Sequence, residues 1–177
     1  MNFQFYLEKL LNSREFLKFK KENPSAFLCS AFFSIDNTEN GKDNQQHLDY
    51  FIPELKKIFS VKLNKNPLEI ISSENATLEG NEYFPKPLPD NLNFEFNDME
   101  NIIRKKMLEE KINKKIEKLL WSIQQKNNKT FLIGTIFISN LGMIKTTIDL
   151  DEKAIVEFEK KSFFDFIKIV KKDKDKN

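Results

Sequence analysis

The stretch that decides the fold prediction is Asn97–Lys126, with the sequence NDMENIIRKKMLEEKINKKIEKLLWSIQQK. Its opening residues, Asn97-Asp98-Met99-Glu100, resemble a capping box, which satisfies free backbone N–H groups in the first turn of a helix. The apolar residues that follow recur at helical spacing and form one stripe: Leu108, Ile112, Ile116, Leu119, Leu120 and Ile123. The pattern predicts one helix over residues 97–126, about 45 Å long at a rise of about 1.5 Å per residue.

A helix of that length is long compared with the domain that would contain it. A compact chain of 177 residues has a radius of gyration of about 16 Å. The expected helix therefore crosses the whole domain or protrudes from it.

The N-terminal segment also has helical spacing. Apolar residues over 3–22 predict helix, and Ser13 can cap a second short helix after a kink near Asn12. We expect this element to end at Asn23-Pro24, because the residue before a proline avoids the α region.

Alternating apolar and polar residues predict a sheet. The run Phe27–Ile35 has apolar side chains on both faces, so both faces should be at least partly covered. Pro53 interrupts a later run, which indicates a bulge, an edge position or a tight turn. Ser162-x-x-Asp165 is expected to cap a last helix that ends near Lys171. The expected strands cover residues 27–35, 48–52, 55–63, 68–71, 130–139, 143–150 and 154–159.

These elements predict one α+β domain over residues 1–171. Its mostly antiparallel sheet, of about five to seven strands, would pack against one long central helix, with N- and C-terminal helices closing the edges. Residues 72–96 contain Pro85, Pro87 and Pro89 without usable periodicity, and predict a long acidic Phe/Pro loop of the kind that tends to be functional or disordered. The charged tail, residues 172–177, is expected to be disordered.

A weak internal duplication is a further hypothesis. At an offset of 104 residues, Lys21–Ile35 aligns with Gln125–Ser139 and four of fifteen positions are identical. A helix–hairpin duplication of this kind would produce a pseudo-twofold sheet with its helices on one face.

Few residues suggest catalysis. His47 is the one histidine and Cys29 the one cysteine, and we expect a hairpin residue and a buried structural thiol respectively. The four glycines form no phosphate-binding motif. The segment Asp36–His47 begins like a calcium loop but has His47 where a glutamate ligand is needed. We therefore expect no enzymatic activity, no cofactor and no bound metal.

Composition and charge restrict the classes of partner that we expect. The formal charge is +2, from 29 basic and 27 acidic residues, and no apolar run approaches the length of a membrane helix. With no signal-peptide pattern at the N-terminus, we expect a cytoplasmic protein without membrane contact.

The charges are nevertheless segregated along the chain. Residues 69–100 hold eight acids and one base, whereas residues 104–129 hold nine bases and three acids. Mutual neutralisation is the simpler interpretation. The alternative is a nucleic-acid-binding protein that uses the basic face of helix 97–126: Arg104, Lys105, Lys111, Lys115 and Lys118.

The favoured hypothesis is a non-catalytic protein-interaction, assembly or chaperone-like adaptor protein. It is based on the missing catalytic set, on a helix long enough to project beyond the core, and on the aromatic and proline residues of the Phe/Pro loop. The order of elements also loosely resembles that of secretion chaperones in topology, and topology alone does not give function. Its partner would be another protein or a second copy of the chain. A small apolar ligand carrier, with a pocket lined by Phe27, Phe33, Phe131 and Phe137, is the other alternative. The expected partner contacts lie on the long helix and in the Phe/Pro loop: Leu108, Ile112, Ile116, Trp121, Phe84 and Leu88.

Overall fold

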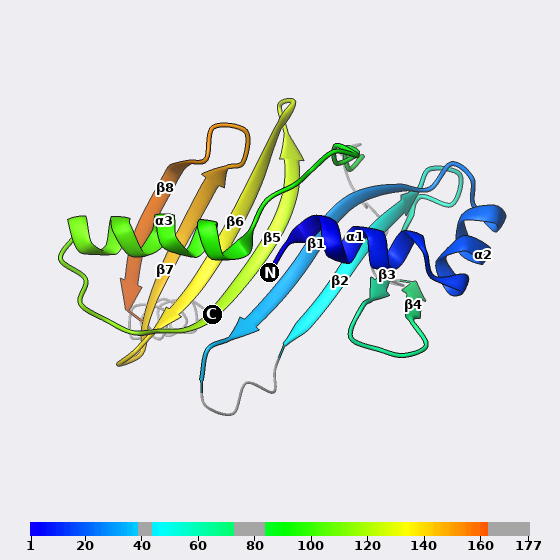
Figure 1. Ribbon diagram of the computed structural model, residues 1–177. Helices are drawn as coiled ribbons and strands as arrows, with labels where there is room; N and C mark the ends of the chain where they lie inside the picture. Colours follow the sequence, from blue (N-terminus) through cyan, green and yellow to red (C-terminus); the bar gives the residue numbers. More distant parts are fainter. Residues whose placement is uncertain (39–43, 73–83, 163–177) are drawn as a thin grey trace, which may run out of the picture.

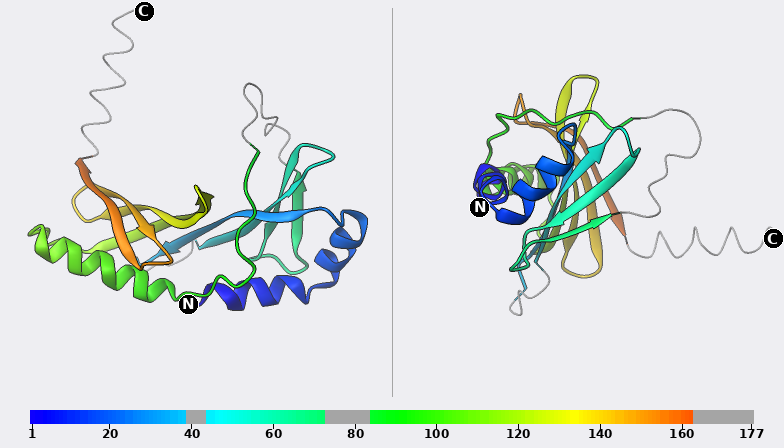
Figure 2. Two further views of the ribbon diagram at one scale, coloured as in Figure 1. Left: turned by 90° about the horizontal axis from the view of Figure 1, so that it is seen from above. Right: turned by 90° about the vertical axis from the view of Figure 1, so that its right-hand side faces the viewer.

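The computed structural model describes residues 1–38, 44–72 and 84–162, which form one antiparallel sheet with helices on one face (Figures 1 and 2). The sheet has eight strands in the order β4-β3-β2-β1-β5-β6-β7-β8. The helices are α1 (Phe3–Leu11), α2 (Arg14–Glu22) and α3 (Phe96–Glu109). The strands are β1 (Phe27–Asp36), β2 (Gln45–Ile52), β3 (Lys57–Lys62), β4 (Glu69–Ser72), β5 (Ile116–Lys126), β6 (Lys129–Ile138), β7 (Gly142–Asp149) and β8 (Ala154–Ser162).

The order of elements repeats, because a helical segment followed by four successive antiparallel strands occurs twice along the chain. The two halves meet where β1 pairs with β5 in the middle of the sheet (Figure 1). The alignment expected from the sequence is wrong, because an offset of 104 residues matches β1 with β6. In the sheet β5 follows α3 as β1 follows α2.

The long central helix is also wrong, and with it the predicted fold class. Helix α3 ends at Glu109, Lys111 adopts a left-handed φ of 55°, and residues 116–126 form the central strand β5. On β5, Leu119, Trp121 and Ile123 are all fully buried, which is a period of two. Pairing with β1 on one side and β6 on the other overrides the helical propensity of this lysine-rich stretch.

Other expected elements agree with the structure. Two helices over residues 3–22 meet at Asn12, and the Ser13 hydroxyl accepts the Phe16 N–H at 3.3 Å as an N-cap. Every expected strand coincides with one of β1 to β8 within a few residues. The helix expected up to Lys171 and the tail 172–177 lie, beyond Ser162, outside the described residues, as do positions 73–83 of the expected loop.

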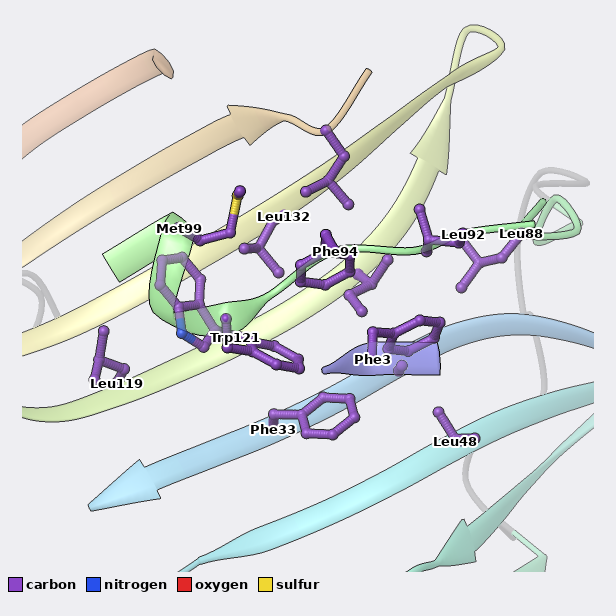
Figure 3. Packing of buried hydrophobic residues seen from close by; sticks show 14 of the residues in the cluster. Phe3, Phe33, Leu48, Leu88, Leu92, Phe94, Met99, Leu119, Trp121 and Leu132 are labelled. Atoms are coloured by element: carbon purple, nitrogen blue, oxygen red, sulfur yellow. The ribbon is translucent and has the colours of Figure 1, made fainter. Parts of the chain in front are cut away.

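The core lies between the sheet and the helices (Figure 3). Phe33, on β1, joins elements from both halves of the chain: its ring lies 6.0 Å from that of Phe3 and 5.2 Å from that of Tyr6, on α1, and 4.6 Å from that of Phe96, on α3. Packing beside Trp121 leaves no room for a side chain at Gly134, where an added Cβ would lie only 2.4 Å from the indole Cζ3. A strand glycine at this position is therefore required by the neighbouring indole.

Candidate functional site

The residues expected to form a partner-binding stripe do not share one surface. Leu108 is 68% exposed near the end of α3, whereas Ile112, Ile116 and Trp121 are buried. Because the stripe is divided between a helix, a connection and a strand, it presents no continuous apolar face to a partner.

The two loop residues have different surroundings. Phe84 is 46% exposed, and its ring centroid lies 6.0 Å from that of Phe51. Leu88 is buried, and its backbone N–H donates to the Leu28 carbonyl at 2.8 Å. This bond anchors residues 84–95, which cross β1 on the way to α3 (Figures 1 and 2).

The five basic residues of the nucleic-acid alternative are spread over three elements. Arg104 and Lys105 lie on α3, where Arg104 is paired with Glu100. Lys111 and Lys115 lie in the connection that follows, and Lys118 lies on β5. The helical face that would have placed all five along a phosphate backbone is therefore absent.

His47 belongs to a polar cluster on the face of the sheet that the helices leave uncovered. Its Nε2 lies 3.7 Å from Asp49 Oδ1, and its ring stacks on Phe32 with centroids 5.1 Å apart. The hydroxyls of Ser30 and Ser60 each donate to the Asp49 carboxylate at 2.6 Å. Both serines are thus directed at the carboxylate and not at the imidazole, which is not the order of a nucleophile–base pair.

Cys29 lies close to this cluster but is chemically quiet. The side chain is buried, its thiol donates to the Asp49 carbonyl at 3.3 Å, and burial is the main cause that raises its pKa to about 12. Because the thiolate is the nucleophile, this cysteine is a poor candidate for covalent chemistry.

Neither a metal site nor a membrane helix is found in the described ranges. Within residues 1–38, 44–72 and 84–162, no three His, Cys, Asp or Glu side chains are grouped so as to hold a metal ion. In the same part of the chain, no helix is both long and apolar enough to cross a membrane.

The uncovered face carries a group of apolar side chains that we call the open-face patch. Strand alternation turns these side chains away from the helices, and within the described residues no helix lies over them (Figure 2). Ile133 is 39% exposed and the others are half-buried. The patch consists of Phe32 on β1, Leu120 on β5, Phe131, Ile133 and Phe137 on β6, and Met143 on β7.

Strand register makes these side chains neighbours. Ser122 pairs with Phe32 on one side and with Ile133 on the other, and Phe137 pairs with Met143. Leu120 lies two residues before Ser122 on β5. It is therefore diagonally opposite Phe32 and Ile133, within reach of cross-strand packing. The solvated face of an antiparallel sheet is usually polar, so these apolar side chains make the face the candidate binding surface.

One row of residues across this face has apolar and small side chains at its middle and charged side chains at both ends. In register order it consists of Glu69, Lys62, His47, Phe32, Ser122, Ile133, Thr147 and Glu157. Lys62 is paired with Glu69, 3.4 Å away. Ser122, on β5, lies between Phe32 and Ile133.

Part of this patch is predictable from the sequence. Phe131, Ile133 and Phe137 alternate with buried residues along β6 and could have been assigned to one face from the sequence alone. Phe33, by contrast, faces the core, so the four phenylalanines expected to line a common pocket point into different surroundings.

Comparisons with known proteins give a fold and no function. No protein-family model matches the chain, and no curated protein matches it. A crystal structure from Clostridium difficile 630, described as "a putative lipoprotein", is similar with a TM-score of 0.54 and 12% sequence identity, over 83% of this chain and 90% of that chain. At this identity the likeness concerns the fold alone.

Proposed function

We propose that the chain is a non-catalytic assembly protein that binds a second copy of itself through the open-face patch. The observation that carries the proposal is the group of six apolar side chains on neighbouring strands of a face that none of the described helices covers. Exposed apolar patches rimmed by polar residues often mark interaction sites.

Two open faces can pack as the layers of a β-sandwich. Such layers lie about 10 Å apart, with their side chains interdigitated and their strand directions within about 30° of each other. The half-buried side chains of the patch are large enough to fill such a gap, and each would lose its remaining contact with water.

The row of residues through Ser122 is compatible with a second copy of the chain as the partner. A twofold axis parallel to the strands and passing beside Ser122 places Phe32 of one copy over Ile133 of the other. Apolar side chains then face apolar side chains at the centre of the pair. The charged ends of the row lie outside this centre, and the same surface serves both copies, as an isologous interface requires.

Sedimentation equilibrium of the wild type and two lysine variants tests this proposal. The wild type should have about twice the 21.0 kDa of one chain. Ile133→Lys should remain folded but raise the dissociation constant by about 30-fold or more, because it places a charge at the centre of the interface. The matched control is Leu108→Lys, an exposed leucine on α3, which should leave the dissociation constant unchanged.

Two results would contradict the proposal. One is a wild type that remains at the mass of one chain across the accessible concentrations. The other is a pattern in which Leu108→Lys dissociates the pair and Ile133→Lys does not.

A further inference from the structure

The last described strand ends beside the open-face patch. Ser162 is the final residue of β8, and the preceding Lys161 pairs with Met143, which in turn pairs with Phe137. Residues that pair in register lie on the same face, so Lys161, Met143 and Phe137 form one row on the open face. Neighbouring strands lie about 4.8 Å apart, so Phe137 is about 10 Å across the sheet from β8.

This end of the patch is hollowed. A cleft of about 400 Å³ opens there, and its lining consists of Asp36, Thr38, Glu117, Lys118, Leu120 and Phe137. The three patch residues at this end are half-buried, so each keeps apolar surface that another layer can cover. We call these three residues the Met143 end of the patch: Leu120, Phe137 and Met143.

The sequence that follows Ser162 is mostly apolar. Residues 163–170 read FFDFIKIV, which is six apolar side chains with one charge of each sign. At helical spacing, four of the apolar side chains share one face, opposite Asp165 and Lys168: Phe163, Phe166, Ile167 and Val170. An apolar stripe of this kind is stable in water only against a surface that covers it.

The length of this segment matches the distance to the patch. Eight residues in a helix extend about 12 Å at about 1.5 Å per residue. Strands β6, β7 and β8 are consecutive neighbours in the sheet (Figure 1). A helix that starts at Ser162 and crosses β7 therefore reaches β6, and its stripe covers Met143 and Phe137 on the way.

The covalent connection favours this segment over a separate molecule at the Met143 end. A segment joined directly to β8 has an effective concentration in the millimolar range, since a short link holds it close to its target. A second copy of the chain at micromolar concentration meets the same surface far less often.

We propose that residues 163–170 pack as a short helix on the Met143 end of the open-face patch of the same chain and there compete with a second copy. The contact stands by itself, whereas the competition rests on the self-association proposed above.

The competition has a calculable size. A chain whose patch is covered must release its own segment before it associates, and both copies of a pair must do so. If about two-thirds of the chains are covered, the dissociation constant is raised by about 10-fold.

NMR of the full chain, labelled at its methionine methyl groups, tests the contact. The Ile133→Lys background is used, because it keeps the chains apart. Phe166→Asp should shift the Met143 resonance, since it removes a ring from the stripe. The matched control is Lys168→Asp, which places the same new side chain on the opposite face and should leave Met143 unchanged. Met99 and Met107, buried on α3, should keep their resonances in both variants.

Sedimentation equilibrium, without the Ile133→Lys substitution, tests the competition. Phe166→Asp should lower the dissociation constant of the pair by about 10-fold, because the patch is then free in every chain. Lys168→Asp should stay within about 2-fold of the wild type.

The contact is overturned if Met143 does not respond to Phe166→Asp, or responds equally to Lys168→Asp. It is also overturned if the Met143 resonance moves on tenfold dilution, which would mean that the segment comes from another chain. The competition is overturned if the chains pair but Phe166→Asp leaves the dissociation constant unchanged.

The contact and the self-association fail separately. A Met143 response in chains that never pair contradicts self-association alone. Pairing with an unresponsive Met143 contradicts the contact alone.

Discussion

Replacing Phe33 by alanine should lower the free energy of unfolding by about 3–5 kcal/mol, the range for removing a fully buried aromatic side chain. Phe33 has no exposed surface, and its ring contacts rings of α1 and α3, so its loss opens a cavity where the two halves of the chain meet. Since a domain is stable by only about 5–15 kcal/mol, much of the stability would be lost.

Urea unfolding followed by circular dichroism, at one chain concentration, measures this effect. Phe5→Ala is the matched control, because Phe5 is 62% exposed on α1 and its truncation should cost about 0.5 kcal/mol or less. Equal losses for Phe33→Ala and Phe5→Ala would mean that Phe33 is not at the junction of sheet and helices.

The second large effect is expected at Gly134, where alanine should destabilise the fold by about 2–3 kcal/mol. A glycine in a strand is ordinarily a weak point, and alanine there should otherwise help by about 0.5–1 kcal/mol. At Gly134 the effect of alanine on stability is reversed, because the new Cβ would lie 2.4 Å from Trp121 Cζ3 and 2.8 Å from Thr146 Cγ2. The same unfolding measurement applies.

A double-mutant cycle isolates that contact. Trp121→Phe removes the six-membered ring of the indole that Gly134 faces, and also a buried indole N–H that has no hydrogen-bond partner in the described part of the chain. In the Trp121→Phe background, Gly134→Ala should cost at least about 1 kcal/mol less than in the wild type. Strict additivity of the two substitutions would show that the cost of Gly134→Ala arises elsewhere.

Strands and short helices were predictable where the sequence has one clear period. Phe27–Ile35 alternates along a strand that only a bulge between Leu28 and Ser30 interrupts, and the Ser13 cap and Asn23-Pro24 delimit the second helix. These signals are local, so they can be recognised without knowing which residues lie nearby in the folded chain.

Residues 110–126 could not be assigned in this way. Ile116, Leu119, Leu120 and Ile123 match helical spacing as well as strand spacing, because β5 is central and its open face also carries an apolar residue, Leu120. The end of α3 contains neither glycine nor proline, and the left-handed position is occupied by Lys111, which gives no sequence signal. Only pairing with β1 and β6 decides between helix and strand.

The open-face patch depends even more on tertiary structure. Phe32, Ser122 and Ile133 share one row only through the register of strands from both halves of the chain. No spacing in the sequence places these residues together.

Crosslinking at Ser122 tests the central claim most directly. In a twofold pair, the Ser122 side chains of the two copies face each other across a gap of about 10 Å between sheets, too wide for a disulfide but within reach of a short bismaleimide. Cys29 is buried and should react slowly, so Ser122→Cys supplies the one fast thiol. We predict that Ser122→Cys is captured as a covalent dimer, while Leu108→Cys, on the helix-covered side, stays a monomer. Equal capture of the two variants, or none at Ser122→Cys, would contradict self-association through the open-face patch.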